Sequence, residues 1–226
     1  MLLTRVFRRL RGRSSAPSGV EDSRLHRRVL CIASSAELVS MPYHYAGWNK
    51  ELFSESPVDR SRFVKSVLRL TDLRFASYDA VYYSHQLKDH SLYEGGRILQ
   101  GIRLLLKPGG FLHLKVPNVL ALMHQLVEEG HDLEDIAYMS AAGPISYHDV
   151  LWGLGTEIAN EGRAQRGHRT GFSRKLLDRL LFDNGFLAVR HLSDPAALEL
   201  EVIAAPEYLH EDYRIMLGLK TIEAGP

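Results

Sequence analysis

Short apolar runs that alternate with helix-forming stretches constrain the fold of this chain more than any other feature. Residues 28–33 (RVLCIA) and 78–84 (YDAVYYS) are nearly continuous apolar runs of strand length, which is typical of strands buried on both faces of a parallel sheet. Apolar residues recur at helical spacing over residues 94–107, over 119–127 and again after Ser173. This order predicts an α/β fold with a doubly wound, mostly parallel sheet.

The turns and caps between these runs predict the boundaries of the elements. Lys107-Pro108-Gly109-Gly110 ends the first helix before a strand over 111–116, and Asn118 and Ser173 each cap a following helix. Residues 186–191 and 198–205 predict two strands in a C-terminal antiparallel hairpin. We therefore expect one domain over 25–210, with a glycine-containing lid or substrate-side insert at 131–170 and a tail at 211–226.

The end of the first apolar run is the most informative turn. Ser34 follows the strand at once, and Glu37 stands where it completes a capping box with Ser34. A strand that turns directly into a helix is the place where open α/β sheets bind their ligands. We expect a ligand site at this edge of the sheet.

Charge and cysteine content exclude several classes of function. The formal net charge is +1, and residues 1–13 contain five arginines and no acid, so the remaining residues carry +1 − 5 = −4. A mildly acidic body argues against binding of nucleic acid. The single cysteine, Cys31, forms no internal disulfide, and the chain shows neither a signal peptide nor an apolar run long enough for a bilayer. These features predict a cytoplasmic protein.

The arginine-rich first residues predict a separate segment. Residues 1–13 place Leu and Phe side chains on one side of a helix and arginines on the other, and residues 14–19 are typical of a linker. We expect a basic amphipathic head and flexible linker over 1–24. The head is suited to bind either an anionic membrane surface or an acidic protein partner. In the first case the protein would be peripheral at a membrane. A presequence and a solvated terminus are the alternatives, and the oligomeric state stays open.

Several motifs in a fixed order resemble one enzyme family. Residues 78–85 (YDAVYYSH), 106–110 (LKPGG), 116–118 (VPN) and 168–172 (HRTGF) are similar to class I S-adenosylmethionine-dependent methyltransferases. The resemblance covers about residues 28–205 and is greatest to small proteins associated with sugar and glycan pathways. It implies a Rossmann-like methyltransferase fold, S-adenosylmethionine as cofactor, and a small-molecule polar acceptor such as a sugar or glycan intermediate.

The same resemblance implies roles for individual residues. The first turn would hold the amino-acid tail of the cofactor, Glu51 would accept bonds from the ribose hydroxyls, and Asp72 with the amide of Leu73 would bind the adenine. The residues implied to contact the cofactor are Ala33, Ser34, Ser35, Glu51, Asp72, Leu73 and Ser84. Asp79 and His85 would lie at or near the methyl-transfer pocket. For Glu51 and Asp72 the alternative is a solvated surface acid.

Two histidines are the candidate catalytic residues. His85 would remove the acceptor proton, because it ends a strand at the ligand-binding edge, and His168 would face the same pocket. The alternatives are a hydrogen bond from His85 to a loop carbonyl and a role for His168 in pinning its loop. No pair of cysteines and no His-Glu-x-x-His spacing occurs, so we expect no metal site.

One departure from the family pattern leaves two functions open. The family turn is rich in glycine, whereas residues 33–37 (ASSAE) contain none, and Lys88-Asp89 stands where the family has a glutamate. Alanine and serine resist the left-handed backbone that such a turn adopts. The chain is therefore either a methyltransferase or a catalytically inactive module of the same fold that acts through protein or membrane-surface binding.

Overall fold

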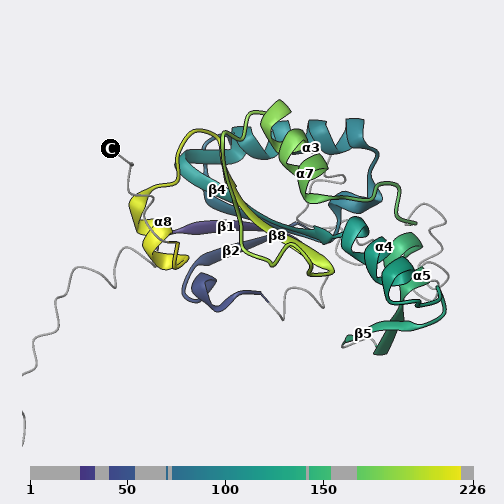
Figure 1. The fold of residues 1–226 in the computed structure, drawn as a ribbon. Coiled ribbons are helices and arrows are strands. Elements are labelled where there is room, and N and C mark those ends of the chain that lie inside the picture. The colour runs from purple at the N-terminus through teal and green to yellow at the C-terminus, as the bar shows by residue number, and fades with distance from the viewer. Residues whose placement is uncertain are drawn as a thin grey trace, which may run out of the picture.

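A six-stranded sheet forms the centre of the molecule in the computed structural model, which describes residues 26–33, 41–53, 70, 73–140, 143–153 and 167–219. Helices α3 and α7 cover one face of the sheet, and α8 lies on the other face at its amino end (Figure 1). A smaller group of elements, α4, β5, β6 and α5, extends beyond the carboxyl ends of the central strands (Figure 1).

The strand order is β2-β1-β3-β4-β8-β7. The strands are β1 (Arg28–Ile32), β2 (Asn49–Phe53), β3 (Tyr78–Ser84), β4 (Leu106–Pro117), β7 (Ala188–His191) and β8 (Glu199–Ala205). The pairs of β1 with β2 and β3, and of β3 with β4, are parallel, whereas β8 is antiparallel to both β4 and β7. The predicted doubly wound, mostly parallel sheet with a C-terminal antiparallel hairpin is confirmed, and β2 was not predicted.

Helices α3 (Leu92–Leu105) and α7 (Arg174–Asp183) pack on one face through an apolar stripe each. Ser91 and Glu94 form a capping box at the start of α3, and Ser173 caps α7. The helix predicted over 94–107 ends earlier, because Leu106 already pairs with Tyr78 as the first residue of β4. On this face, the core therefore consists of the apolar stripes of α3 and α7 packed against the strand side chains that point toward them.

The other face is covered by aromatic side chains. Tyr45 ends the 3₁₀ helix η1 (Tyr43–Tyr45), and Tyr213 belongs to α8 (Glu211–Met216). Both pack with Trp48 against a buried apolar surface that includes Phe111 and Cys31. The predicted tail at 211–226 thus contains a helix that contributes to the core. Burial raises the pKa of Cys31 to about 12, so this thiol is a core residue.

The elements beyond the sheet form a lobe with a core of its own. We call α4 (Val119–Glu128), β5 (Ile136–Ser140), β6 (Gly143–Ser146) and α5 (Tyr147–Trp152), with their described connections, the α4–α5 lobe. Leu122, Ile145, Tyr147 and Val150 are buried together inside it. The lobe includes the first part of the predicted insert at 131–170, where the structure finds a hairpin and a short helix rather than irregular chain.

Some predictions fall on residues that the structure does not describe. These are the head and linker over 1–24, the capping box at Ser34 and Glu37, and the acid Asp72. Within the described ranges, every helix is too short or too polar to cross a lipid bilayer.

Candidate active site at the carboxyl end of the sheet

His85 lies where β3 ends, next to the carboxyl ends of β1 and β4. Its φ of 52° is in the left-handed region, which residues other than glycine rarely adopt. Its backbone N–H donates to the carbonyl of Lys115 at 2.9 Å, and the ammonium of Lys88 donates to its carbonyl oxygen at 2.6 Å. Neighbouring groups therefore hold this unusual conformation, as is common for residues at functional sites.

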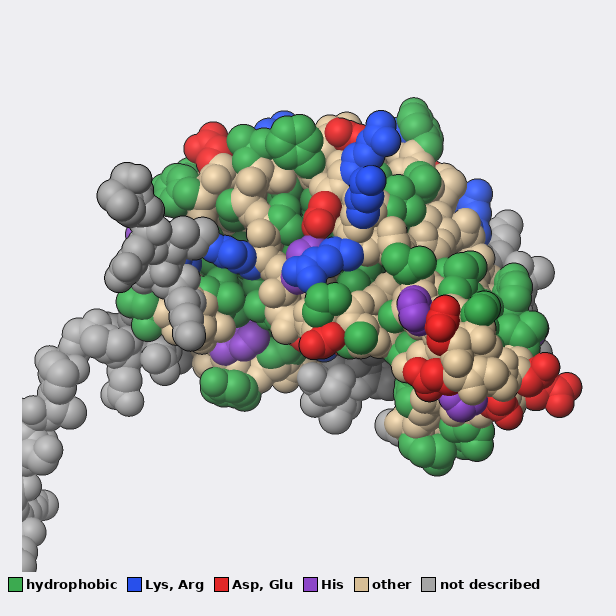
Figure 2. Space-filling view, viewed as in Figure 1, with side chains coloured by type: hydrophobic (Ala, Val, Ile, Leu, Met, Phe, Trp, Pro, Cys, Tyr) green, Lys and Arg blue, Asp and Glu red, His purple; other side chains and the backbone are tan. Residues whose placement is uncertain are grey.

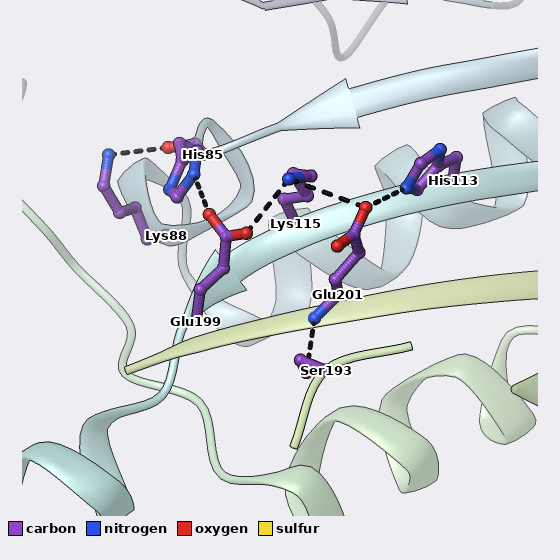
Figure 3. Close-up of polar contacts among 7 residues, drawn as sticks. All are labelled: His85, Lys88, His113, Lys115, Ser193, Glu199 and Glu201. Atoms are coloured by element: carbon purple, nitrogen blue, oxygen red, sulfur yellow. Dashed lines mark hydrogen bonds and ion pairs between the residues drawn. The ribbon is translucent and has the colours of Figure 1, made fainter. Parts of the chain in front are cut away.

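The imidazole of His85 is bonded to a carboxylate from a distant part of the chain. Its Nε2 lies 2.6 Å from Oε2 of Glu199, the first residue of β8. Because β8 runs antiparallel to β4, its first residue reaches the edge at which the parallel strands end. The ammonium of Lys115 donates to the other oxygen of Glu199 at 3.0 Å. Both carboxylate oxygens are thus engaged by basic side chains (Figure 3).

These contacts determine which nitrogen of His85 carries a proton. Burial alone would raise the pKa of Glu199, but the hydrogen bonds and charges of His85 and Lys115 outweigh it and lower the pKa to about 2. At neutral pH the carboxylate is ionised and can only accept, so Nε2 of His85 must donate. In the neutral imidazole the lone pair is then on Nδ1, which has no bonded partner among the described residues. A histidine in this state can accept a proton from a ligand.

The network continues along the same face of the sheet. His113 and Lys115 stand two residues apart on β4, and Glu199 and Glu201 stand two residues apart on β8. Because every second side chain of a strand points to the same face, the four side chains lie on one side of the sheet. The ammonium of Lys115 lies 3.5 Å from Oε1 of Glu201, and Nε2 of His113 lies 2.7 Å from that oxygen (Figure 3). The hydrogen bond and charge of His113 lower the pKa of Glu201. The chain of contacts therefore runs from partly buried His85 to fully buried His113.

The inner end of this network reaches η1. Nδ1 of His113 lies 3.1 Å from the hydroxyl of Tyr45, and both side chains are buried. The ring of His44 stacks on His113 with 5.6 Å between ring centres, and burial with the charge of His113 lowers the pKa of His44 to about 4. His85 is thus connected, through the polar side chains of β4 and β8, to the segment that links β1 and β2.

His168 lies beside this site, and its ring forms a hydrogen bond to a backbone carbonyl rather than to His85 or Glu199. Its Nδ1 is 3.0 Å from the carbonyl oxygen of Val150, and the next two backbone N–H groups, of Arg169 and Thr170, both donate to the carbonyl of Lys88. Burial and the positive charge of Lys88 lower the pKa of His168 to about 4, and His85 adds to this effect. The neutral ring and its backbone bond match the reading in which His168 pins its loop beside His85.

Two of the residues implied to contact the cofactor lie at the expected edge. Ala33 directly follows β1 and Ser84 ends β3, and both are buried. Their strands are neighbours, because Ile32 pairs with Tyr83. Small side chains at two adjacent strand ends let a bound group approach the backbone. Ser34, Ser35 and Asp72 lie outside the described residues.

Glu51 and Leu73 do not lie as the resemblance implied. Glu51 is in the middle of β2, and its carboxylate accepts a hydrogen bond of 2.8 Å from Arg28, the first residue of β1. It is therefore directed toward the amino end of the sheet, whereas ligands bind at the carboxyl end. The backbone N–H of Leu73 donates to the carbonyl of Leu70 at 3.0 Å, which leaves it no proton for an adenine ring.

Asp79 is a further correction. The sequence placed it near the methyl-transfer pocket, but it is the second residue of β3 and lies toward the opposite end of that strand from His85. Its carboxylate accepts hydrogen bonds from the ammonium of Lys107 at 2.7 Å and the hydroxyl of Tyr213 at 2.8 Å. Asp79 therefore has a structural role in joining α8 to the sheet.

Sequence reasoning missed the residues that organise His85. Glu199 and Glu201 stand two apart in an apolar run near the C-terminus, and His113 and Lys115 stand two apart in another. Charged residues at a spacing of two inside buried strands were the available signal, since they must share one face. Their pairing depends on β8 lying beside β4, which the spacing does not reveal.

The described residues fit a bound S-adenosylmethionine in part. The small side chains of Ala33 and Ser84 suit a group held against the ends of β1 and β3. The carboxylate of Glu51 is already occupied by Arg28, so the described part of β2 supplies no acid for the ribose. The site is thus better equipped, in its described part, to take a proton than to hold a nucleoside.

Comparisons with known proteins bear on the fold. A scan against protein-family models found no match, and a search of curated proteins found none. Among solved structures, an O-methyltransferase family protein of Burkholderia thailandensis is similar with a TM-score of 0.50 at 14% identity, covering 83% of this chain and 55% of that one. A SAM-dependent methyltransferase of Archaeoglobus fulgidus gives 0.49 at 13%, covering 79% and 85%. At such identities the likeness concerns architecture alone: the chain has a Rossmann-like fold of the class I methyltransferase type.

Proposed function

We propose that this chain transfers a methyl group from S-adenosylmethionine to a hydroxyl or amino group of a small polar acceptor, such as a sugar or glycan intermediate, with His85 as the base. The observation that carries the proposal is the 2.6 Å contact between Nε2 of His85 and Glu199 at the ligand-binding edge of the sheet. The fold and the ordered sequence motifs support the choice of cofactor.

The roles of the residues follow from the contacts. The acceptor proton passes to Nδ1 of His85, while Glu199 holds Nε2–H and stabilises the imidazolium that forms. Lys115 holds the second oxygen of Glu199 and keeps the carboxylate turned toward His85. S-adenosylmethionine supplies the methyl group as an electrophile. Positioning of the acceptor accounts for most of the rate enhancement in such a transfer, and a base adds about 10²- to 10⁴-fold.

A binding experiment and a transfer experiment test the proposal together. Calorimetry with S-adenosylmethionine and its demethylated product should show binding to the wild type, to His85→Gln and to Glu199→Gln. Transfer of a labelled methyl group to a panel of small hydroxyl and amino compounds should fall by about 10²-fold or more in His85→Gln, because a base is lost. His124→Gln and Glu207→Gln are matched controls on exposed residues outside the His85–Glu199 network. Absence of binding by the wild type at millimolar ligand would refute the proposal.

The second candidate is a non-catalytic module of the same fold. Two observations favour it: the carboxylate of Glu51 is occupied by Arg28, and the amide of Leu73 is occupied by Leu70. In this case neither S-adenosylmethionine nor its demethylated product raises the melting temperature of the wild type. A ligand that binds only the native state must raise it, so the thermal shift discriminates between the two candidates.

A further inference from the structure

The surface of the α4–α5 lobe is unusually rich in exposed apolar side chains. Among the described residues, eight of the nineteen exposed large apolar side chains belong to this lobe. They are Leu120, Met123, Val127, Leu133, Ile136, Tyr138, Met139 and Trp152. Trp152 is 49% exposed. Clusters of exposed apolar side chains on a soluble domain mark interaction sites more often than chance.

Part of this surface is a continuous stripe on one helix. Leu120, Met123 and Val127 follow each other at spacings of three and four along α4, so they lie on one side of it. The packed side of α4 is a different one, formed by Leu122 and Leu126 against the lobe core. The helix therefore has two apolar sides, of which the described structure covers one.

The same lobe carries a strong negative charge. Residues 119–153 contain six acids and neither lysine nor arginine. The acids are Glu128, Glu129, Asp132, Glu134, Asp135 and Asp149. In the described part of the chain, the ion pairs of Glu129 and Asp135 are with His131, at 3.3 and 3.5 Å. Figure 2 shows acidic side chains directly beside apolar ones over this lobe.

The acidic side chains of the lobe also act on a tyrosine in its core. Tyr147 is buried against α4 and donates from its hydroxyl to Gln125 at 3.0 Å. Burial raises the pKa of Tyr147, and the charges of Glu129 and Asp135 raise it further. The lobe is therefore a region of negative potential with apolar side chains between the carboxylates. A partner that fits it must be cationic and amphipathic, which excludes anionic lipid surfaces and nucleic acids.

This chain contains such a segment. Residues 1–13 contribute Leu2, Leu3, Val6, Phe7 and Leu10 at helical spacing, with five arginines and no acid. Residues 14–25 follow it and connect it to the described domain. We propose that residues 1–13 bind to the α4–α5 lobe, with their apolar side chains on Leu120, Met123 and Val127 and their arginines on the surrounding carboxylates. The inference uses the exposed side chains of the lobe and not His85 or Glu199, so it does not depend on the proposed enzymatic activity.

Photocrosslinking in the full-length chain tests the proposal. A variant with Phe7→p-benzoylphenylalanine is irradiated, digested and mapped by mass spectrometry. Crosslinks should fall within residues 119–153, and their yield should drop when salt is raised from about 0.05 to about 0.5 M, where screening reduces exposed charge pairs. Mixing isotope-labelled with unlabelled chains shows whether the head comes from the same chain or a neighbouring copy, and either result supports the proposal.

Two pairs of variants make the test specific. Glu128→Gln with Glu134→Gln should reduce the crosslink yield by about threefold or more, since each removes an exposed charge contact. Met123→Ser with Val127→Ser should reduce it as well, because the apolar stripe is lost. The matched controls outside the lobe are Glu207→Gln with Glu211→Gln, and Leu187→Ser with Ile215→Ser. All substituted side chains are exposed, so circular dichroism should show unchanged folding.

Three results would overturn the inference. They are crosslinks that map outside the lobe, crosslinks within it that are equally frequent in lobe and control variants, and a lack of crosslinks. If the wild type instead co-sediments with phosphatidylserine vesicles while its head fails to crosslink to the lobe, the head is a membrane anchor and the lobe is not its binding site.

Discussion

Tyr213 donates a 2.8 Å hydrogen bond to Oδ1 of Asp79 and so joins the last described helix to the central sheet. The other oxygen of Asp79 accepts from the backbone N–H of Arg28 at 2.8 Å and from the ammonium of Lys107 at 2.7 Å. The guanidinium of Arg27 lies over the Tyr213 ring, 5.0 Å from its centre. On this face of the sheet, α8 covers the amino ends of the parallel strands. The network from His85 to His113 lies on the same face, toward the carboxyl ends of those strands.

Removing this hydroxyl should weaken the fold measurably. Tyr213→Phe keeps the ring contacts and leaves one oxygen of buried Asp79 without its donor, so we expect a loss of about 1–3 kcal/mol in the free energy of unfolding. Urea denaturation measures it. Tyr208→Phe, on an exposed tyrosine, is the control and should change stability little. Equal stability of both variants would show that the bond contributes nothing.

Gly110 is predicted to be intolerant of any side chain. A Cβ there would lie 2.9 Å from the carbonyl oxygen of Asp79 and 3.0 Å from that of Lys107, and backbone atoms cannot rotate away. Gly110→Ala should therefore destabilise the protein by about 1–3 kcal/mol, as overpacking does in protein cores. Gly167→Ala, whose Cβ would meet its nearest neighbour at an ordinary 3.5 Å, should be far milder in the same thermal or urea measurement.

The Glu199 carboxylate should contribute stability that acid removes. Its folded-state pKa of about 2 lies below its ordinary 4.5, so the stabilising contribution is present above pH 4.5 and is lost as the pH falls toward 2. Because the side chain is 37% exposed, water screens the contacts and the contribution is about 1 kcal/mol. Between pH 5 and 3, Glu199→Gln should lose less unfolding free energy than the wild type. Parallel acid profiles of the two proteins would contradict this.

His168 should make the fold less stable in mildly acidic solution. Its folded-state pKa of about 4 lies below its ordinary 6.5, so between these values the unfolded chain binds the proton more strongly than the folded chain. The free energy of unfolding therefore decreases as the pH is lowered from 6.5 toward 4. His168→Gln should reduce the difference in unfolding free energy between pH 7 and 5 by about 1 kcal/mol. His44, with a similar pKa, keeps its own contribution in both proteins. Exposed His124→Gln serves as the control, and an unchanged slope in His168→Gln would refute the expectation.

The central strands and helices were predictable because their signals are local. The apolar run at 28–33 and the aromatic run at 78–84 became β1 and β3, and Asn118 and Ser173 cap helices as their positions indicated. A cap needs only a side-chain oxygen near three backbone N–H groups, and a buried strand needs only a continuous apolar run. By contrast, β2 begins with exposed polar residues, Asn49 and Lys50, and carried no such signal.

The candidate site was predictable only in part. His85 followed from the end of a predicted strand, but the positions of Glu51, Leu73 and Asp79 were inferred from the order of motifs and proved different. A motif does not reveal which end of the sheet a side chain reaches or which backbone group already occupies an amide. Arg28 and Tyr213, which occupy Glu51 and Asp79, come from other parts of the fold, whereas the carbonyl that occupies the amide of Leu73 belongs to Leu70, three residues earlier in the chain.

The amino-acid sequence by itself determined the alternation of strands and helices, the capped helix starts and the final antiparallel hairpin, because each depends on neighbours within a few residues along the chain. Only the tertiary structure decided that Glu199 meets His85 and that Lys115 joins the two carboxylates of β8. Those contacts exist because β8 inserts beside β4 in the opposite direction, and strand order depends on packing across the whole sheet rather than on any local pattern.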